Sequence, residues 1–251
     1  MKTTGNTILI TGGGSGIGRA LAEAFHKAGN EVIIAGRRQG ALDEVVAANP
    51  GMHAAVLDIE DAAAIAAFAK DLTARFPALD AVIHNAGIMR TEKLIEGGLD
   101  TAEHTIATNL LGPIRLNDAL LPHLLARPQA SIITVSSGLA FLPLAATPTY
   151  SATKAAIHAY TMALRHQLKS TNVEVLELAP PYVQTELMGE QQASDPRAMP
   201  LAEFIDEVMA IIAQGPANGE ILVERVKPLR NAEASGDYHG YFTKFNDAMA
   251  H

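Results

Sequence analysis

Short apolar runs rich in β-branched residues alternate along the chain with longer, alanine-rich segments that have helical periodicity. Most of these runs are continuously apolar, which is typical of strands that are buried on both faces of a parallel sheet. The predicted strands are Thr7–Thr11, Glu31–Gly36, His53–Asp58, Asp80–His84, Ala130–Ser136, Val173–Ala179 and Glu220–Arg225. The predicted helices are Gly16–Ala28, Ala41–Ala48, Ala62–Arg75, Thr101–Leu125 with a kink near Pro113, Tyr150–Lys169 and Leu201–Ala213.

This alternation predicts an α/β fold in a single domain, residues 1–251. We expect a Rossmann-type doubly wound parallel sheet of about seven strands with helices on both faces. Two segments do not follow the alternation. Residues 188–200 are polar and contain two prolines, which predicts a loop that acts as a lid over a substrate site. Residues 231–251 are polar and then aromatic, and form either a docked C-terminal helix or a frayed end.

Composition narrows the function classes. Of 251 residues, 48% are hydrophobic and only 18% are charged, which excludes a disordered chain and favours a homo-oligomer whose surface is covered by other subunits. A net charge of -8 argues against a nucleic-acid partner. The lack of cysteine excludes a disulfide scaffold, a thiolate nucleophile and a cysteine-ligated zinc. No signal peptide or membrane-spanning run is visible, so we expect a cytoplasmic protein with no membrane partner.

A glycine-rich turn joins the first predicted strand to the first helix: Thr11-Gly12-Gly13-Gly14-Ser15-Gly16-Ile17-Gly18. Glycines allow a tight turn and close approach of a ligand, and the helix N-terminus offers free N–H groups and a favourable dipole to a pyrophosphate. The spacing through Gly12, Gly16 and Gly18 is G-x-x-x-G-x-G, and no G-K-[ST] follows, which excludes a P-loop. We interpret this turn, with Ser15 and Ile17, as the phosphate-binding loop of a dinucleotide site.

The end of the second strand bears on the choice of cofactor. An NAD site favours an acidic residue here, which binds the 2′-hydroxyl of the adenine ribose. This chain has Gly36 followed by Arg37 and Arg38, and guanidinium groups suit a 2′-phosphate. We therefore expect NADP(H), with a solvated arginine pair as the alternative. Asp58, before Ile59, is expected to accept the adenine amino group or else to serve only the turn.

Tyr150 and Lys154 lie four residues apart at the start of a long predicted helix and therefore project from the same face. The pKa of a free tyrosine is near 10, and a neighbouring ammonium group favours the phenolate, which would give a general acid and base near neutral pH. This spacing alone is common. The prediction of a catalytic pair is stronger here because Ser136 and Ser137 end the fifth predicted strand, at the carboxyl edge where open α/β sheets bind ligands.

Together these motifs resemble the short-chain dehydrogenase/reductase (SDR) family, in its short single-domain type, over essentially the whole chain. The matching positions are Thr11-Gly12-x-x-x-Gly16-Ile17-Gly18, Asp58, Asn85-Ala86-Gly87, Asn109, Ser137, Tyr150, Lys154 and Pro180-x-x-Val183-x-Thr185. The resemblance implies an NADP(H)-dependent oxidoreductase, a carbonyl reductase or alcohol dehydrogenase, that interconverts a ketone and its secondary alcohol by hydride transfer.

The resemblance also implies roles for the catalytic residues. Tyr150 would donate a proton in reduction and accept one in oxidation, and Lys154 would lower the pKa of Tyr150 and bind the nicotinamide ribose with it. Ser137 would hydrogen-bond the substrate oxygen. We choose it over Ser136 because the family places this serine thirteen residues before the tyrosine. Asn109 would kink its helix and hold a water molecule of the proton relay.

For the cofactor, the resemblance implies that Asn85–Gly87 supports the adenine ribose, that the Val183 backbone holds the carboxamide and that Thr185 holds the pyrophosphate. Two positions depart from the family pattern. The usual Pro-Gly is Pro180-Pro181 here, which stiffens this wall and removes one N–H donor. His84 replaces an asparagine, and we expect a packed strand residue. Three segments together resemble those of a bacterial subgroup that is named after a D-alanine-transfer operon: Ser136–Phe141 (Ser-Ser-Gly-Leu-Ala-Phe), residues 163–168 and Pro180-Pro181.

The predicted substrate pocket is mostly apolar, which favours a hydrophobic or aromatic ketone or secondary alcohol. Its expected lining is Met89, Leu139, Phe141, Leu142, Pro143, Leu144, Ala146, Pro181, Tyr182, Leu187 and Met188. Arg90 is the one nearby charge, and either binds a substrate carboxylate or lies in a solvated loop.

Three further interpretations stay open. No H-E-x-x-H occurs, and no carboxylate is evident near His158 and His166, so we expect no metal. Small residues at Ala152, Ala156, Ala159 and Ala163 either pack on the sheet or meet a twin helix in a homodimer or homotetramer. The alternative function is a non-catalytic NADP-binding sensor or scaffold, which has no need for a Ser-Tyr-Lys set. A sugar-nucleotide epimerase or dehydratase needs a longer chain.

Overall fold

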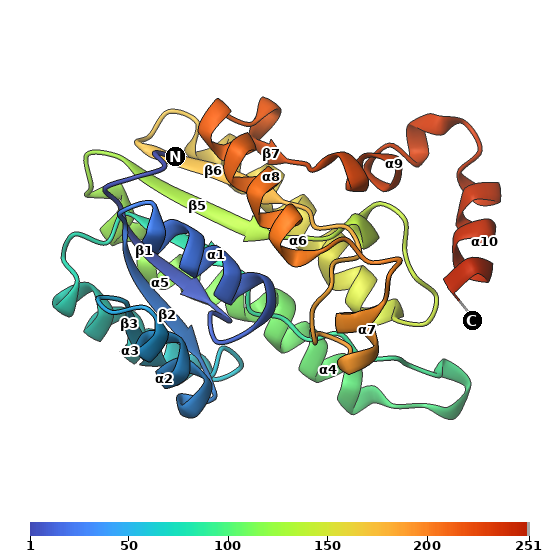
Figure 1. Cartoon of the computed structure of the whole chain (residues 1–251), viewed down its shortest axis with the longest axis horizontal. Helices are drawn as coiled ribbons and strands as arrows, with labels where there is room; N and C mark the ends of the chain where they lie inside the picture. The colour runs from blue at the N-terminus through green and yellow to red at the C-terminus, as the bar shows by residue number, and fades with distance from the viewer. Residues whose placement is uncertain (250–251) are drawn as a thin grey trace.

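Seven apolar segments form one parallel sheet in the computed structural model of the chain, which describes residues 1–249 (Figure 1). The strand order is β3-β2-β1-β4-β5-β6-β7, and all neighbours are parallel. The strands are β1 (Thr7–Thr11), β2 (Glu31–Gly36), β3 (His53–Val56), β4 (Ala81–His84), β5 (Ala130–Val135), β6 (Val173–Leu178) and β7 (Glu220–Ile221). The predicted Rossmann-type fold is therefore confirmed.

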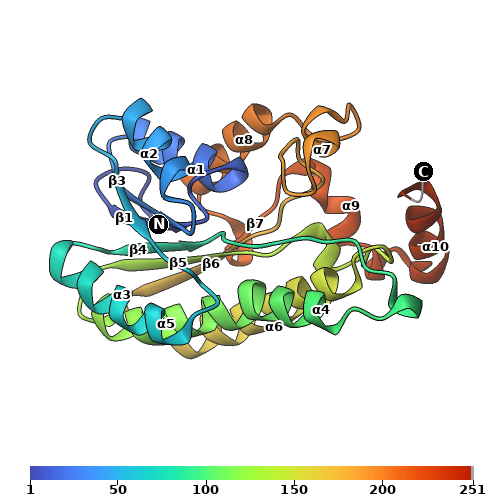
Figure 2. The ribbon, with the colours of Figure 1, turned by 90° about the horizontal axis from the view of Figure 1, so that it is seen from below.

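Helices cover both faces of the sheet, as the view in Figure 2 shows. On one face lie α1, α2 and α8, and on the other lie α3, α4, α5 and α6. The helices are α1 (Gly16–Lys27), α2 (Gln39–Ala48), α3 (Ala62–Arg75), α4 (Leu99–Ile106), α5 (Gly112–Leu125), α6 (Pro148–Leu168), α7 (Glu190–Ser194), α8 (Leu201–Gln214), α9 (Lys227–Arg230) and α10 (Tyr238–Met249).

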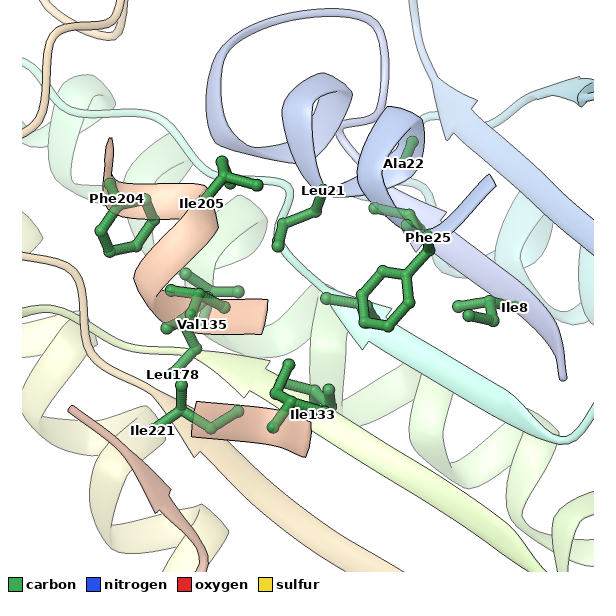
Figure 3. Packing of buried hydrophobic residues seen from close by; sticks show 14 of the residues in the cluster. Ile8, Leu21, Ala22, Phe25, Ile133, Val135, Leu178, Phe204, Ile205 and Ile221 are labelled. Atoms are coloured by element: carbon green, nitrogen blue, oxygen red, sulfur yellow. The ribbon is translucent and has the colours of Figure 1, made fainter. Parts of the chain in front are cut away.

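Each face of the sheet has its own apolar core because successive strand residues point to opposite sides. Ile8 and Ile10 of β1 pack toward α1 and α8, whereas Leu9 between them packs toward α3 and α5. In the first core, Phe25 from α1 and Phe204 from α8 are completely buried (Figure 3). This packing on both faces explains why the strands read as continuous apolar runs.

The order of strands reverses direction at β1, which lies between β2 and β4. Chain connections leave to opposite sides at this point, so a crevice opens at the carboxyl ends of these strands. The glycine-rich loop follows β1, the arginine pair follows β2, and Asn85 follows β4. Topology thus brings three motifs from distant parts of the sequence to one edge.

The predicted helix over 101–125 is two helices that are joined by a π-helical turn at Ala107–Leu111. The N–H of Gly112 donates to the carbonyl five residues earlier. Pro113, the expected site of the kink, lies in the first turn of α5. Since proline has no N–H, the carbonyl of Asn109 lacks its usual α-helical donor. The irregularity is therefore centred on Asn109, just before Pro113, near which the sequence predicted a kink.

Other segments also differ from the sequence prediction. Strand β7 stops at Ile221 because residues from Glu224 turn into a short 3-10 helix. Residues 188–200, expected to be a loop, contain α7. The tail contains α10, where Asn246 accepts from the N–H of Ala145 and donates to the carbonyl of Pro143. Residues 250 and 251 of the predicted tail lie outside the described residues. Among residues 1–249, no helix has the length and apolar composition that a membrane crossing needs.

The small residues of α6 face outward. Ala152, Ala159 and Ala163 are exposed and Ala156 is half-buried, whereas Ile157 and other residues of α6 are buried against the sheet. The first of the two interpretations of this stripe, flat packing on the sheet, is therefore wrong. The helix meets the sheet through larger side chains, and most of its small residues lie on the outer surface.

Candidate active site

The glycine-rich loop makes a close contact with the end of β4 and leaves the start of α1 free. Gly12 has a φ of +69°, and a Cβ there would lie 2.9 Å from the Cα of Ala86. A Cβ on Gly18 would overlap the carbonyl oxygen of Gly12. Ser15 precedes α1 with an extended backbone and makes no side-chain cap hydrogen bond. The first-turn N–H groups of α1 are therefore available to an anion.

Thr11 links this loop to β4, a role that the sequence motif did not reveal. Its Oγ1 accepts the N–H groups of Asn85 and Ala86, each at 3.1 Å. The side chain of Asn85 donates to the Thr11 carbonyl oxygen at 3.0 Å. These bonds fix the position of Asn85 relative to the glycine-rich loop.

Two cavities lie along the carboxyl edge of the sheet and share the glycine-rich loop, Arg37 and Arg38. The smaller cavity has a volume of about 190 Å³, and its lining includes Leu42, Ile59 and Thr108. The larger has a volume of about 440 Å³. Predicted residues on its wall are Gly12, Ser15, Gly16, Ile17, Arg37, Arg38, Asn85, Ala86, Gly87, Met89, Arg90, Ser136, Ser137, Tyr150, Lys154, Pro180, Pro181, Val183, Thr185 and Leu187.

Ser137, Tyr150 and Lys154 meet on the wall of the larger cavity, and all three are buried. The Oγ of Ser137 accepts the N–H of Leu139 at 3.1 Å, which orients the hydroxyl. The Nζ of Lys154 donates to the carbonyl oxygen of Val135 at 2.7 Å and lies 5.5 Å from the centre of the Tyr150 ring.

Burial controls the acid–base properties of this pair. It raises the pKa of Tyr150 to about 12, although a hydrogen bond with Ser137 lowers it in part. Burial also lowers the pKa of Lys154 to about 8. Burial therefore opposes the charged forms of both side chains, the phenolate of Tyr150 and the ammonium of Lys154.

Asn109 is locked into the π-helical turn. Its Oδ1 accepts the N–H of Ile88, and its Nδ2 donates to the Ile88 carbonyl, both at 2.9 Å. A further bond reaches Thr153 on α6 at 3.2 Å. The side chain is thus fully used in joining α4, α6 and the segment after β4, and the backbone carbonyl is the group of Asn109 that stays available to a water molecule.

The arginine pair lines both cavities. Arg37 lies 3.4 Å from Glu60, and Arg38 donates to the Oγ of Ser15 at 3.4 Å. Glu60 also accepts from Thr108 at 2.7 Å, a contact that local sequence did not indicate. Asp58 is exposed and its carboxylate accepts the N–H of Glu60, so its observed contact is the turn contact, and it lines neither cavity.

Comparison with known proteins assigns the family. Residues 6–196 match the family described as short chain dehydrogenase. An uncharacterized oxidoreductase, DltE, from Bacillus subtilis (strain 168) is 39% identical over 98% of this chain and 98% of its own length. The chain belongs to the short-chain dehydrogenase family. The resemblance inferred from its motifs is thus confirmed.

Solved structures of short-chain dehydrogenases have the same fold. One from Streptomyces avermitilis has a TM-score of 0.83 and 26% identity, and the match covers 98% of this chain and 99% of that one. One from Burkholderia cenocepacia J2315, solved in complex with NADP, also has a TM-score of 0.83, with 25% identity and coverage of 97% and 98%. This chain is accordingly an oxidoreductase of that family.

The predicted substrate pocket of this short-chain dehydrogenase is only partly assembled from the expected residues. Met89, Pro181 and Leu187 line the larger cavity. Eight of the predicted lining residues do not: Leu139, Phe141, Leu142, Pro143, Leu144, Ala146, Tyr182 and Met188. Proximity in sequence to Tyr150 was a poor guide, because the segment between β5 and α6 turns away from the cavity after Ser137.

Two of these residues have other partners. The Phe141 ring lies 4.8 Å from the His158 ring and 4.7 Å from the Arg230 guanidinium. The hydroxyl of Tyr182 donates to Asp195 at 3.2 Å, which anchors the segment beyond α7. Both aromatic side chains therefore stabilise surrounding elements of this short-chain dehydrogenase.

Two histidines are informative. His84 is buried, its Nε2 lies 2.7 Å from Asn117 Oδ1, and burial lowers its pKa to about 4 despite that hydrogen bond. It is a packed strand residue, as expected.

The expectation that no carboxylate lies near His158 was wrong, because β6 and β7 bring Glu177 and Glu220 within 4.8 Å. Arg230 binds Glu220 at 3.0 Å, so these charges are already paired.

Proposed function

We propose that this protein is an NADP(H)-dependent carbonyl reductase or alcohol dehydrogenase that interconverts a hydrophobic or aromatic ketone and its secondary alcohol. One observation carries the proposal: Ser137, Tyr150 and Lys154 lie on the wall of the same cavity as the phosphate-binding loop and the arginine pair. A binding protein without catalytic activity would have no use for a buried hydroxyl, phenol and ammonium group at this position.

The residues of the two cavities fit a dinucleotide. The free N–H groups of α1 would hold the pyrophosphate, and Lys154 with Tyr150 would hold the nicotinamide ribose. Asn85–Gly87 would support the adenine ribose beside the sheet. When bound, NADP(H) supplies or accepts the hydride.

The protein side chains would manage the proton. The Ser137 hydroxyl is oriented by Leu139 and can donate to the substrate oxygen. The Tyr150 phenol would donate its proton to that oxygen in reduction and take it back in oxidation. A water molecule on the free carbonyl of Asn109 would connect Lys154 to solvent, and this role suits the π-helical turn.

The preference for NADP(H) rests on charge. Gly36 takes the place of an acidic residue, and Arg37 and Arg38 border both cavities. Guanidinium groups bind phosphate by charge-assisted hydrogen bonds. The NADP bound to the Burkholderia cenocepacia relative supports the same choice here.

The remaining features of the proposal concern substrate access and assembly. Met89, Pro181 and Leu187 supply an apolar substrate wall, and residues 188–200 form the lid. The exposed small residues of α6 suit a twin helix in a homodimer or homotetramer. We also propose that the protein acts in the cytoplasm.

The test is a panel of aromatic, aliphatic and carboxylate-bearing ketones, assayed with NADPH and with NADH by the loss of nicotinamide absorbance. We expect turnover of apolar ketones with NADPH preferred. NADPH binding without turnover of any ketone or alcohol would favour the sensor or scaffold instead.

A further inference from the structure

Gln192 is a polar side chain that the sequence did not single out, and it lies in the wall of the larger cavity. Its Nε2 donates to the carbonyl oxygen of Val183 at 2.8 Å and to Oγ1 of Thr185 at 3.1 Å. Its Oε1 accepts the N–H of Met188 at 3.1 Å. Both ends of this carboxamide are therefore bound to the segment that follows β6.

Gln192 holds the lid segment onto the cavity. Of residues 186–197, all of which the structure describes, only Gln192 is buried. The segment is pinned beyond α7, where Val183 pairs with Met199. Before α7 it passes through Gly189, whose φ of +100° marks a turn. Within α7 itself, Gln192 is the buried side chain, and the end of the helix is also held at Asp195, which accepts from Tyr182 and Gln184.

The two acceptors that Gln192 uses are suited to another primary amide. A carbonyl oxygen beside a hydroxyl oxygen binds the NH₂ of a carboxamide, and the nicotinamide ring of the proposed cofactor carries this group. We propose that Gln192 is an internal competitor for the nicotinamide carboxamide, and that cofactor binding releases Gln192 and with it α7. This role rests on the proposed NADP(H) function, and in it Gln192 couples cofactor binding to the lid.

The competition has a direct consequence for affinity. Replacing Gln192 by alanine or by methionine, which keeps the length but has no amide, removes the competitor. Each hydrogen bond contributes modestly to stability, so we expect NADP⁺ to bind about three- to tenfold more tightly to both variants. The gain requires the nicotinamide half, so binding of 2′-phospho-ADP-ribose, which lacks that ring, should not change.

Calorimetric titration of both ligands into the full-length protein tests this. Gln191→Ala is the matched control, because Gln191 is the exposed neighbour on the same short helix. Unchanged or weaker NADP⁺ binding in both Gln192 variants, with normal melting curves, would overturn the inference. Equal tightening of 2′-phospho-ADP-ribose would do the same. Failure of the unaltered protein to bind NADP⁺ would instead overturn the proposed function.

Discussion

The Lys154 ammonium group lies 5.5 Å from the centre of the Tyr150 ring, yet it donates its hydrogen bond to the carbonyl oxygen of Val135. The two side chains are close enough to influence each other, but both are buried, and burial dominates. It raises the pKa of Tyr150 to about 12 and lowers that of Lys154 to about 8. In the protein without cofactor, burial thus opposes a Tyr150 phenolate at neutral pH.

The ionisation of Tyr150 should depend on bound oxidised cofactor. Without cofactor, we expect no Tyr150 phenolate below about pH 10, since burial opposes the charged form. With NADP⁺, the positive nicotinamide ring should lower this pKa. Ultraviolet difference titration of the unaltered protein against Tyr150→Phe isolates the signal. A phenolate that titrates near neutral pH without cofactor would contradict the expected effect of burial.

Tyr150→Phe should reduce turnover by about 10²–10⁴-fold, which is the usual contribution of general acid–base catalysis. The variant keeps the ring and its packing, so NADPH binding should persist. Ser137→Ala should mainly lower turnover, whereas Lys154→Met should lower both turnover and NADPH affinity. Steady-state kinetics and a separate binding titration distinguish these outcomes. Substantial activity in verified Tyr150→Phe protein would show that another group is the acid.

Arg37→Ala should raise the Michaelis constant for NADPH and leave NADH use nearly unchanged. A lost charge-assisted contact with the 2′-phosphate costs about 1.5–3 kcal/mol, or roughly 10- to 150-fold. Arg75→Ala is the control, because Arg75 is exposed, lines neither cavity, and has Asp71 and the Phe76 ring as its described contacts. Equal or better activity of the unaltered enzyme with NADH would refute the assignment.

His84 should make stability depend on pH. The folded protein keeps it neutral to about pH 4, whereas the unfolded chain protonates it near pH 6.5. The unfolded state therefore binds more protons between these values, and the free energy of unfolding falls as pH drops through that window. The shift corresponds to about 3 kcal/mol. Urea unfolding at several pH values measures this dependence. As pH drops, the free energy of unfolding should fall less in His84→Asn than in the unaltered protein. Parallel pH dependences of the two proteins would rule out this role of His84.

The outer face of α6 should mediate self-association. Light scattering at micromolar concentration should give a homodimer or homotetramer, and Ala159→Arg should dissociate it by placing a charge on that face. Gln167→Arg is the control, because Gln167 is exposed near the far end of the same helix. A monomer in the unaltered protein would contradict the prediction.

The sequence predicted which side chains meet at the candidate site better than it predicted the wall of the larger cavity. Tyr150 and Lys154 lie on one helix, so their spacing alone places them together. Phe141 and Leu144 precede that helix by a few residues, yet neither lines the cavity. An irregular segment has no periodicity from which the direction of its side chains can be read. Gln192 escaped notice for the same reason.

Local chemistry therefore determined the strands, most helices, the phosphate-binding loop and the acid–base pair. Apolar periodicity, glycine and charge act within one element, and their effect is visible in the order of residues. Only the tertiary structure decided the pKa shifts, the joining of Asn109 to Ile88 and the binding of Gln192 to Val183. Burial and long-range hydrogen bonds arise when distant segments pack together, and the strand order that brings them together is a property of the folded sheet.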